Sequence, residues 1–179
     1  MSNFNFSPFP LLSTERLHLR NVELSDDLEI FFFRSDVRML EFIDRAPANE
    51  IEEVRIFIKK IQGGIQNGEC IEWGICLKNN PQLLGTICLW NISIENNSAE
   101  VGYVLHPNQQ GKGIMQEALI SVLEYGFRIM KLDSIEAVLD PANMRSVRIL
   151  EKNSFVKKEI SGVPKTVQYS LKNPYSQPI

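Results

Sequence analysis

Hydrophobic and polar positions alternate along the first regular stretch of the chain, Thr14–Arg20. Leu17 and Leu19 fall on one face of this stretch, while the charged side chains and His18 fall on the other. A period of two is typical of a strand with one buried face. We therefore predict a half-buried strand here, with His18 in solvent rather than in a catalytic role.

Two helices are predicted next. Ser25-Asp26-Asp27 offers a capping residue and two acids at a helix start, where the helix dipole favours negative charge. Phe31–Phe33 is interpreted mainly as core packing, since three adjacent helical residues cannot share one face. Isoleucines then recur at helical spacing through residues 51–65, after an Asn49–Glu52 capping box, and Gly63–Gly64 should weaken the end of that helix.

The hydrophobic period then returns to two, which predicts a run of strands. Cys70–Leu77 and Leu83–Asn91 flank an Asn79–Pro81 turn, and Glu100–Leu105 follows a turn at Glu95–Ser98. Strands joined by short turns pair antiparallel, so we expect an antiparallel meander here.

Helices interrupt the last strands. The predicted elements are a long helix that opens after Gly113 and ends near Arg128, a strand at 134–139, a helix opened by Pro141–Asn143, and closing strands at 156–159 and 166–171 around a Gly162–Pro164 turn. The helical crossover predicts that strands 99–105 and 134–139 lie side by side and parallel. Asn153 is the expected left-handed residue after the second helix.

The composition is that of one globular domain. The 179 residues are 44% hydrophobic and 23% charged, with a formal net charge of −3. We divide the chain into an N-terminal arm at 1–13, a single domain at 14–173 and a C-terminal tail at 174–179. The sequence has no dense basic tract, which argues against nucleic-acid binding, and no long apolar run, which argues against a membrane span.

The N-terminus and the cysteines indicate a cytoplasmic location. Met1–Pro10 has neither the basic segment nor the apolar run of a signal peptide. Cys70, Cys76 and Cys88 are odd in number and each lies in an apolar stretch, which favours reduced thiols in a core. None of them has a histidine or cysteine partner at ligand spacing, so no metal site is expected.

The strongest chemical signal is the glycine turn Gln110–Met115, which joins a strand to a helix. The first amides of a helix lack partners within it and carry the positive end of the helix dipole, so such a turn can hold a pyrophosphate. The turn lacks the frame of a Walker loop. Gln116 stands where a dinucleotide-binding fingerprint needs its third glycine.

Gln110, Gly113 and Met115 fit the Arg/Gln-x-x-Gly-x-Gly/Ala pattern of the acetyl-CoA turn in GNAT N-acetyltransferases, apart from the large last residue. The chain resembles the RimJ/RimL-like branch of that superfamily, whose best-known members acetylate the amino termini of ribosomal proteins. The segments that carry the resemblance are Thr14–Arg20, Leu84-Gly85, Glu100–Tyr103, Gln110–Leu119, and Asn143-x-x-Ser146 through Phe155.

The resemblance implies an α/β (α+β) architecture, the GNAT acyl-CoA N-acyltransferase fold. Its central sheet is mixed and mostly antiparallel, with splayed parallel central strands, and is flanked by helices. Acetyl-CoA is the implied co-substrate, and no metal is implied. A backbone amide near Val104 or Leu105 is expected to polarise the acetyl carbonyl. The residues expected to contact acetyl-CoA are Val104, Leu105, Gln110, Gly111, Lys112, Gly113, Ile114, Met115, Asn143 and Ser146.

Two side chains have expected catalytic roles through the same resemblance. Glu100 matches a strand carboxylate that acts as general base in some relatives; the alternative is an ordinary surface carboxylate. Ser146 matches a serine proposed as general acid; the alternatives are a cofactor contact or a bond to its own helix. Arg145 and Arg148 flank Ser146 and are interpreted either as phosphate contacts or as solvated side chains.

The implied acceptor is a primary amine. Deprotonating a lysine at neutral pH costs roughly 3–4 kcal/mol more than deprotonating an α-amine, because their reference pKa values differ. A protein amino terminus, of ribosomal proteins among others, is therefore favoured, or a small amine such as an amino sugar, a polyamine or an antibiotic. A non-catalytic acyl-CoA-binding module is the contrasting class. An isologous homodimer is a candidate oligomer.

Overall fold

The computed structural model describes residues 4–158 and 166–176. Within these residues, eight strands form one mixed sheet in the order β1-β2-β3-β4-β5-β6-β8-β7. The strands are β1 (Leu12–Ser13), β2 (Leu17–Asn21), β3 (Ile71–Leu77), β4 (Asn80–Ser93), β5 (Ser98–Leu105), β6 (Ser134–Leu139), β7 (Val156–Lys158) and β8 (Val167–Lys172). The predicted fold class, a mixed sheet flanked by helices, is confirmed.

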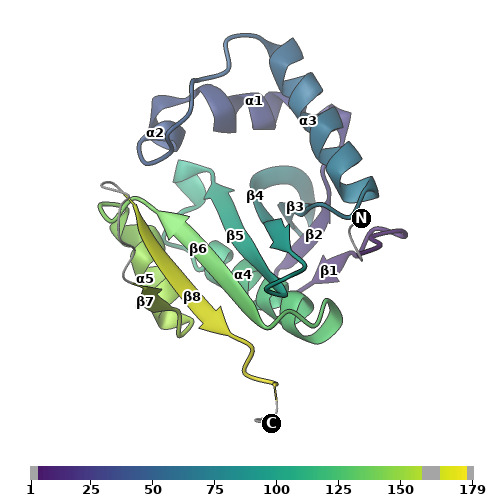
Figure 1. The fold of residues 1–179 in the computed structure, drawn as a ribbon. Coiled ribbons are helices and arrows are strands. Elements are labelled where there is room, and N and C mark those ends of the chain that lie inside the picture. Colours follow the sequence, from purple (N-terminus) through teal and green to yellow (C-terminus); the bar gives the residue numbers. More distant parts are fainter. Residues whose placement is uncertain (1–3, 159–165, 177–179) are drawn as a thin grey trace.

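Helices cover both faces of the sheet. They are α1 (Asp27–Ser35), α2 (Val37–Leu40), α3 (Ile51–Gln66), α4 (Ile114–Glu124) and α5 (Met144–Lys152), with short 3₁₀ turns at Leu24–Asp26 and Pro107–Gln109. Figure 1 shows α1, α2 and α3 together on one side of the sheet. None of the helices in the described part of the chain is long and apolar enough to cross a membrane.

The pairing of the central strands agrees with the prediction. β3, β4 and β5 pair antiparallel in succession. β5 and β6 pair parallel, with Ser98 beside Ser134 and Glu100 beside Glu136. The closing strands also form, with β8 antiparallel to both β6 and β7. The turn predicted at Gly162–Pro164 lies outside the described residues.

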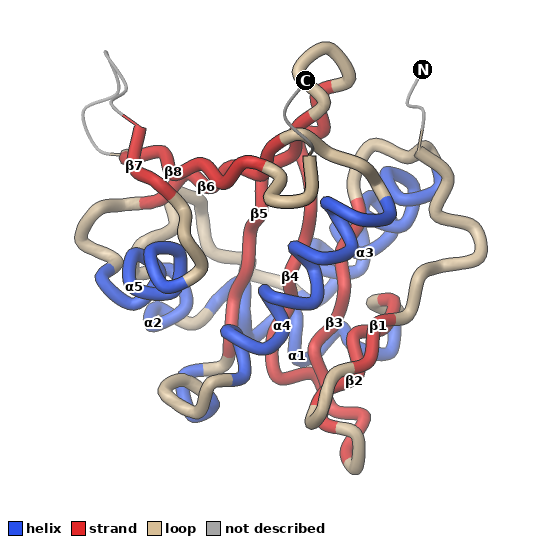
Figure 2. Tube along the Cα trace, turned by 90° about the horizontal axis from the view of Figure 1, so that it is seen from below, coloured by secondary structure: helices blue, strands red, loops and turns tan. Residues whose placement is uncertain are grey.

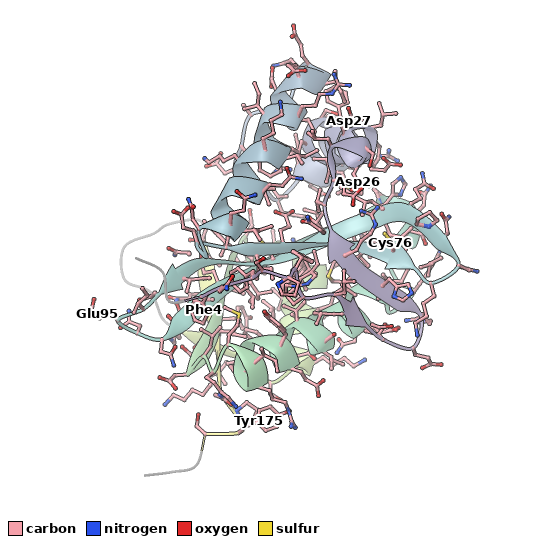
Figure 3. All side chains as sticks on the ribbon, turned by 90° about the vertical axis from the view of Figure 1, so that its right-hand side faces the viewer. Phe4, Asp26, Asp27, Cys76, Glu95 and Tyr175 are labelled. Atoms are coloured by element: carbon pink, nitrogen blue, oxygen red, sulfur yellow. The ribbon has the colours of Figure 1, made fainter. Side chains whose placement is uncertain are left out.

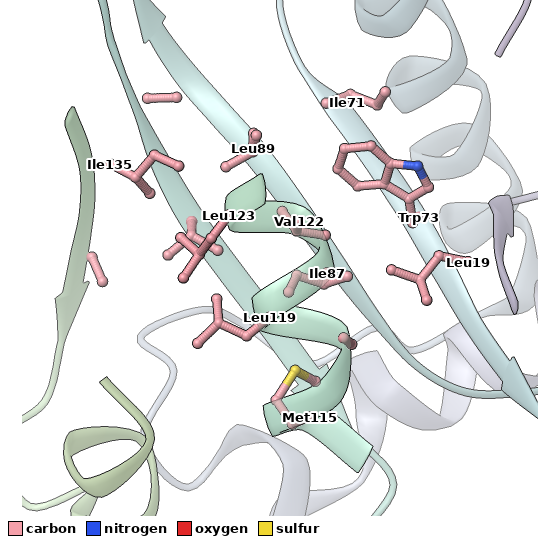
Figure 4. Close-up of a cluster of buried hydrophobic side chains, with 14 of the residues drawn as sticks. Leu19, Ile71, Trp73, Ile87, Leu89, Met115, Leu119, Val122, Leu123 and Ile135 are labelled. Carbon is pink, nitrogen blue, oxygen red and sulfur yellow. The ribbon is translucent and has the colours of Figure 1, made fainter. Parts of the chain in front are cut away.

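The larger hydrophobic core lies between the sheet and the helices α4 and α5. Leu119 and Val122 of α4 are fully buried there, as are Trp73 of β3 and Ile87 of β4 (Figure 4). Figure 2 shows α4 crossing the central strands of the sheet. The helix packs flat on the sheet because it has a broad apolar surface, with six of its residues buried.

A smaller core lies on the opposite face, under α1, α2 and α3. Val54 and Ile58 of α3 are fully buried, which confirms the predicted amphipathic spacing. Phe33 of α1 joins them, as expected of the aromatic run, whereas Phe32 stacks on His106 with ring centroids 4.7 Å apart. The run therefore packs on two different neighbours rather than on one.

The N-terminal segment packs against the body of the protein. Phe6 is buried, and Phe9 meets Trp73 edge-on with ring centroids 6.3 Å apart. The Trp73 indole Nε1 donates a hydrogen bond of 2.7 Å to the carbonyl of Pro10. A buried indole N–H requires an acceptor. The N-terminal segment supplies this acceptor to Trp73, the largest fully buried side chain among the described residues.

The start of α1 differs from the prediction. Ser25 lies in a 3₁₀ turn, and Asp26 is the N-cap residue without a side-chain capping bond. The Asp26 carboxylate instead accepts hydrogen bonds of 2.8 and 2.7 Å from the Arg20 guanidinium, and another of 2.8 Å from the Glu23 amide. Asp26 therefore ties β2 to the helical layer, at the position seen in Figure 3.

The capping box predicted at Asn49–Glu52 is also wrong. Glu50 is the N-cap residue of α3, and the Asn49 amide donates to the Glu53 carboxylate at 3.4 Å. The helix starts one residue later than predicted, so the acid that reaches back is also one residue later. The helix then runs through Gly63–Gly64 to its end at Gln66.

Two later boundaries are shifted as well. The β3–β4 hairpin turns at Lys78 and Asn79, one residue earlier than predicted. The helical run after the glycine turn ends at Ile129, as expected of an end near Arg128, but its last five residues, Tyr125–Ile129, are π-helical. The left-handed residue after α5 is Ser154, with φ 65°, and not Asn153, with φ −96°. The side-chain amides of Asn153 and Gln116 exchange hydrogen bonds of 2.8 and 3.1 Å, which hold Asn153 in place. The chain therefore turns one residue later, at Ser154.

Candidate active site

β5 and β6 separate after a short paired stretch. Their pairing runs only from Ser98 beside Ser134 to Glu100 beside Glu136, so the predicted splay is present. The His106 amide donates to Leu84 of β4 at 2.7 Å. Because neighbouring residues of a strand direct their amides to opposite sides, the Leu105 amide faces the gap between β5 and β6. Of the two amides expected at the acetyl carbonyl, this geometry favours Leu105 over Val104.

The glycine turn lies at the end of β5 and leads into α4. Gly111 has φ 77° and Gly113 has φ 76°, conformations that side chains disfavour. Gly113 is the N-cap residue of α4, and the first helical hydrogen bond is from the Glu117 amide to the Gly113 carbonyl at 3.1 Å. The backbone amides of Ile114, Met115 and Gln116 therefore have no partner within the helix and point out of its N-terminal end, as an anion site requires.

Hydrogen bonds across the gap fix the first residue of this turn. The Gln110 side-chain Nε2 donates to the Leu105 carbonyl at 3.1 Å. The Arg145 guanidinium of α5 donates to the Gln110 side-chain oxygen. Gln110 therefore links the end of β5 to α5. Arg145, for which the sequence allows either a phosphate contact or a solvated side chain, is a hydrogen-bond partner of Gln110.

The segment before β2 fixes the other side of the turn. The Arg16 guanidinium donates to the Glu117 carboxylate at 2.6 Å and to the Lys112 carbonyl at 3.0 Å. Glu117 also accepts from the Thr14 hydroxyl and from the Arg16 amide. Burial opposes ionisation of Glu117, but these hydrogen bonds from Thr14 and Arg16 prevail and lower its pKa. The resemblance carried by residues 14–20 thus has a structural reason, because that segment holds the glycine turn.

A cavity of about 540 Å³ extends along the glycine turn and the gap. Most of the residues expected to contact acetyl-CoA line it, and Met115 and Ile114, although largely buried, are among them. Arg148 also lines the cavity. The expected residues in its lining are Val104, Leu105, Gln110, Gly111, Gly113, Ile114, Met115, Asn143 and Ser146. Lys112 is not in this lining, and its ammonium donates to Gln109 at 3.1 Å.

A second cavity, of about 350 Å³, lies on the face of the sheet under α1 and α3. The two cavities share part of their lining at the gap between β5 and β6. The shared residues are Phe42, Ile43, Tyr103, Val104, Asn143 and Ser146. A molecule in the first cavity can therefore present its end to a molecule in the second.

Asn143 and Ser146 sit at this junction because of how α5 begins. Asn143 is the N-cap residue of α5, and its side-chain oxygen accepts from the Ser146 amide at 3.2 Å. The Tyr103 hydroxyl is buried, and burial raises its pKa to about 12 while the Ser146 hydroxyl acts in the opposite direction. Tyr103, which the sequence pattern predicts only as a strand residue, lines both cavities.

Glu100 lies outside the lining of both cavities. It is half-buried on β5 and accepts a hydrogen bond of 3.4 Å from the Asn91 side chain. Burial raises its pKa, the Asn91 bond opposes this, and the neighbouring Glu136 carboxylate adds to it. Val104 lies four positions after Glu100, which is a distance of about 13 Å along an extended strand. Glu100 can act at the junction only through water.

A different carboxylate, Glu72 of β3, lines the second cavity. Burial raises the pKa of Glu72, while the Thr86 hydroxyl and the charges of Arg34 and Arg45 oppose this. None of these four residues belongs to a motif that the sequence reveals. The available signal was Glu72 itself, a charged residue within the otherwise uncharged Ile71–Leu77 strand.

The floor of the second cavity is formed where small side chains leave room. Glu72, Cys88 and Gly102 are neighbours across β3, β4 and β5. A Cβ on Gly102 would lie 3.2 Å from the Cys88 sulfur and 3.5 Å from the Trp90 indole nitrogen. All three cysteines are free thiols, as expected. Burial raises the pKa of Cys88 well above its ordinary value, so its thiol is protonated at neutral pH.

The chain is similar to proteins that share this architecture. A family described as an acetyltransferase (GNAT) domain matches residues 16–156. An uncharacterized N-acetyltransferase of Bacillus licheniformis, p20, is 34% identical over 146 residues, which are 82% of each chain.

Among solved structures, a GNAT-family acetyltransferase from Bacillus anthracis has a TM-score of 0.79 at 24% identity and covers 92% of this chain and 99% of its own. The ribosomal-protein-S5-alanine acetyltransferase from Vibrio fischeri has a TM-score of 0.78 at 23% identity, over 94% of this chain and 100% of its own. At these identities the two structures support the fold, whereas the sequence matches support the family. The chain belongs to the GNAT family and is an acetyl-CoA-dependent N-acetyltransferase.

Proposed function

We propose that this enzyme transfers the acetyl group of acetyl-CoA to a primary amine by direct attack of the amine on the thioester. The observation that supports this most is the junction of the two cavities at the gap between β5 and β6. Direct transfer requires both substrates to be bound at once with their reacting atoms in contact. Two cavities that meet at one gap suit that requirement.

In this proposal the pyrophosphate of acetyl-CoA lies on the glycine turn, at the amides of Ile114 and Met115. The pantetheine arm follows the gap, where strand amides lack strand partners. The Leu105 amide donates to the acetyl carbonyl and stabilises the oxyanion that forms when the amine attacks. Asn143 and Ser146 contact the same arm from α5.

The attacking amine must lose a proton to a base on its own side of the sheet. Glu100 and Glu72 both face that side, and burial raises the pKa of each, which suits a general base. The cavity lining favours Glu72 over Glu100, and because neither residue lines the junction, either one would take up the proton through water. The C–S bond then breaks, and the thiolate takes up a proton. The proposed donors of this proton are the hydroxyls of Ser146 and Tyr103, which line the first cavity.

The proposed acceptor is an α-amine, because its reference pKa leaves a larger neutral fraction at pH 7 than a lysine has. The name of the structurally similar Vibrio fischeri protein, a ribosomal-protein-S5-alanine acetyltransferase, is compatible with an N-terminal acceptor. A small amine is the second candidate, since the spermidine N(1)-acetyltransferase of Vibrio cholerae is 24% identical over 79% of each chain.

The test is thiol release from acetyl-CoA in the presence of a panel of amines. The panel should contain short peptides with free amino termini, polyamines, amino sugars and free amino acids. The proposal expects release that depends on both acetyl-CoA and an amine, together with an acetylated product of the expected mass. Stabilisation by acetyl-CoA without thiol release for any amine would indicate a non-catalytic acyl-CoA-binding module instead.

A further inference from the structure

Two arginines line the second cavity outside the junction. Arg34 comes from the last turn of α1, Arg45 from the segment between α2 and α3, and Glu72 from β3. All three line the cavity, and each is only partly exposed. Two guanidinium groups and one carboxylate therefore share this part of the cavity, which leaves it with a net positive charge.

Neither guanidinium is paired with a carboxylate. Within the described residues, no carboxylate oxygen lies within 4.0 Å of a nitrogen of Arg34 or Arg45. Arg34 lies over the Phe57 ring, 3.7 Å from its centroid. Arg45 donates one hydrogen bond of 3.0 Å to the Phe33 carbonyl, at the end of α1.

Arg45 also carries a buried donor without an acceptor. Among the described residues its Nε has no hydrogen-bond partner. A buried donor left unsatisfied is costly, and in native proteins it usually marks a site for a water or a ligand. Burial, together with the charge of Arg34, lowers the pKa of Arg45 to about 10. Burial likewise lowers the pKa of Arg34. The nearby Glu72 carboxylate raises both pKa values but does not offset these effects, so a bound anion would be favourable in this part of the cavity.

We infer that the acceptor amine carries an anionic group, a carboxylate in the simplest case, which binds at Arg34 and Arg45 while the amine points toward the junction. This inference rests on the proposed function. A guanidinium is well suited to a carboxylate because its planar donors match the two oxygens. A polyamine, which carries only positive charge, is disfavoured by the same two arginines.

Two sources could supply this chemistry. The carboxylate can be that of a free amino acid or a similar small aminocarboxylate, or it can be the side chain of an acidic residue near a peptide amino terminus. A cavity of about 350 Å³ is compatible with a single amino acid or a terminal residue. The arginines would bind the carboxylate in the same way in both cases, so the experiment below is designed to distinguish the two sources.

The experiment compares matched amines that differ in one carboxylate, with each kcat/KM calculated for the neutral fraction of the amine. Free α-amino acids are paired with their carboxamides, short peptides that begin with Glu or Asp are paired with those that begin with Gln or Asn, and spermidine is included. For the wild-type protein we expect kcat/KM to be about tenfold or more higher for the carboxylate member of at least one pair, as expected for one charge-assisted hydrogen bond. The pair type that shows the preference identifies the source.

Variants connect that preference to the site. Arg34→Gln should reduce the preference to less than about twofold, and Arg34→Lys, which keeps the charge, should retain part of it. Arg45 also binds the Phe33 carbonyl, so Arg34 is the safer position for the test. Arg55→Gln is the matched control, because Arg55 is an exposed arginine of the same helical layer that pairs with Asp27 outside the cavity. It should keep the full preference.

The outcomes separate the inference from the proposed function. If amines are acetylated but carboxamides or spermidine are used as well as or better than carboxylates, the inference is wrong and the proposed function stands. If the preference exists but survives Arg34→Gln, the anion is bound elsewhere and the inference is also wrong. If no amine in either set is acetylated, the proposed function fails, and the inference fails with it.

Discussion

Replacing Glu72 and Glu100 in turn with glutamine tests which of the two carboxylates is the general base. Glu72→Gln keeps the size and the hydrogen bonding of the side chain but removes its ability to accept a proton. We expect kcat to fall about a hundredfold or more near neutral pH, within the usual contribution of general-base catalysis. The Michaelis constant for acetyl-CoA should hardly change, because Glu72 lines only the second cavity.

The geometry gives a smaller expectation for Glu100→Gln. Glu72 is two strands from Val104 and displaced by two residues, about 12 Å, which is similar to the 13 Å or so that separates Glu100 from Val104 along β5. Distance alone therefore does not decide between the two bases. The cavity lining decides between them, because Glu72 lines the second cavity and Glu100 does not. We expect Glu100→Gln to reduce kcat less than about tenfold, compared with a hundredfold for Glu72→Gln.

The pH dependence provides the assay. Burial raises the pKa of Glu72 above the ordinary value of 4.5, so the wild-type rate should increase with pH through that raised pKa as the carboxylate forms. The deficit of Glu72→Gln should become smaller at high pH, where the amine is already neutral. If Glu100→Gln shows the hundredfold loss while Glu72→Gln is close to wild type, the reasoning from the cavity is refuted. If both variants retain the wild-type rate at every pH, the enzyme works by proximity and oxyanion stabilisation on the neutral fraction of its amine.

Three further predictions concern the cofactor and the fold. Gly113→Glu places a side chain and a negative charge at the expected pyrophosphate position, so the folded variant should lose most of the thermal stabilisation that acetyl-CoA gives the wild type; an unchanged shift would refute this position. Gly85→Ala should lower the free energy of unfolding by about 1–3 kcal/mol in denaturant titrations, because its Cβ would lie 2.2 Å from the Val104 carbonyl. Gly63→Ala, with open space around its Cβ, should stabilise α3 or leave it unchanged, and equal losses at both glycines would contradict the packing argument. Ser146→Ala should raise the Michaelis constant for acetyl-CoA more than it lowers kcat; the reverse pattern would make Ser146 the acid for the thiolate.

Much of the fold could be predicted because its elements have strong periodic patterns. The period of two in β2–β5 and the helical spacing in α3 and α4 determine which faces are buried, and the crossover between β5 and β6 determines their parallel pairing. Element ends were less predictable. The Asn153 side chain is held by Gln116, which lies 37 residues away in the sequence, and no local propensity contains that contact.

The two halves of the candidate site differ in the same way. The glycine turn is a contiguous motif with required backbone angles, so Gly111 and Gly113 could be recognised from the sequence. The acceptor cavity is assembled from side chains of α1, the α2–α3 segment, β3 and β4. Arg34, Arg45 and Glu72 are far apart in the chain and belong to no motif, so only the packing of the helical layer on the sheet reveals them.

The claim that the two substrates meet at the gap between β5 and β6 is tested most directly by initial-velocity kinetics. The rate of thiol release is measured as acetyl-CoA and the best amine of the panel are varied together. A ternary complex predicts double-reciprocal plots that intersect, with no acetylated protein when acetyl-CoA is mixed with the enzyme alone. Parallel plots, with an acetyl group found on the protein by mass spectrometry, would show a covalent intermediate and contradict direct transfer.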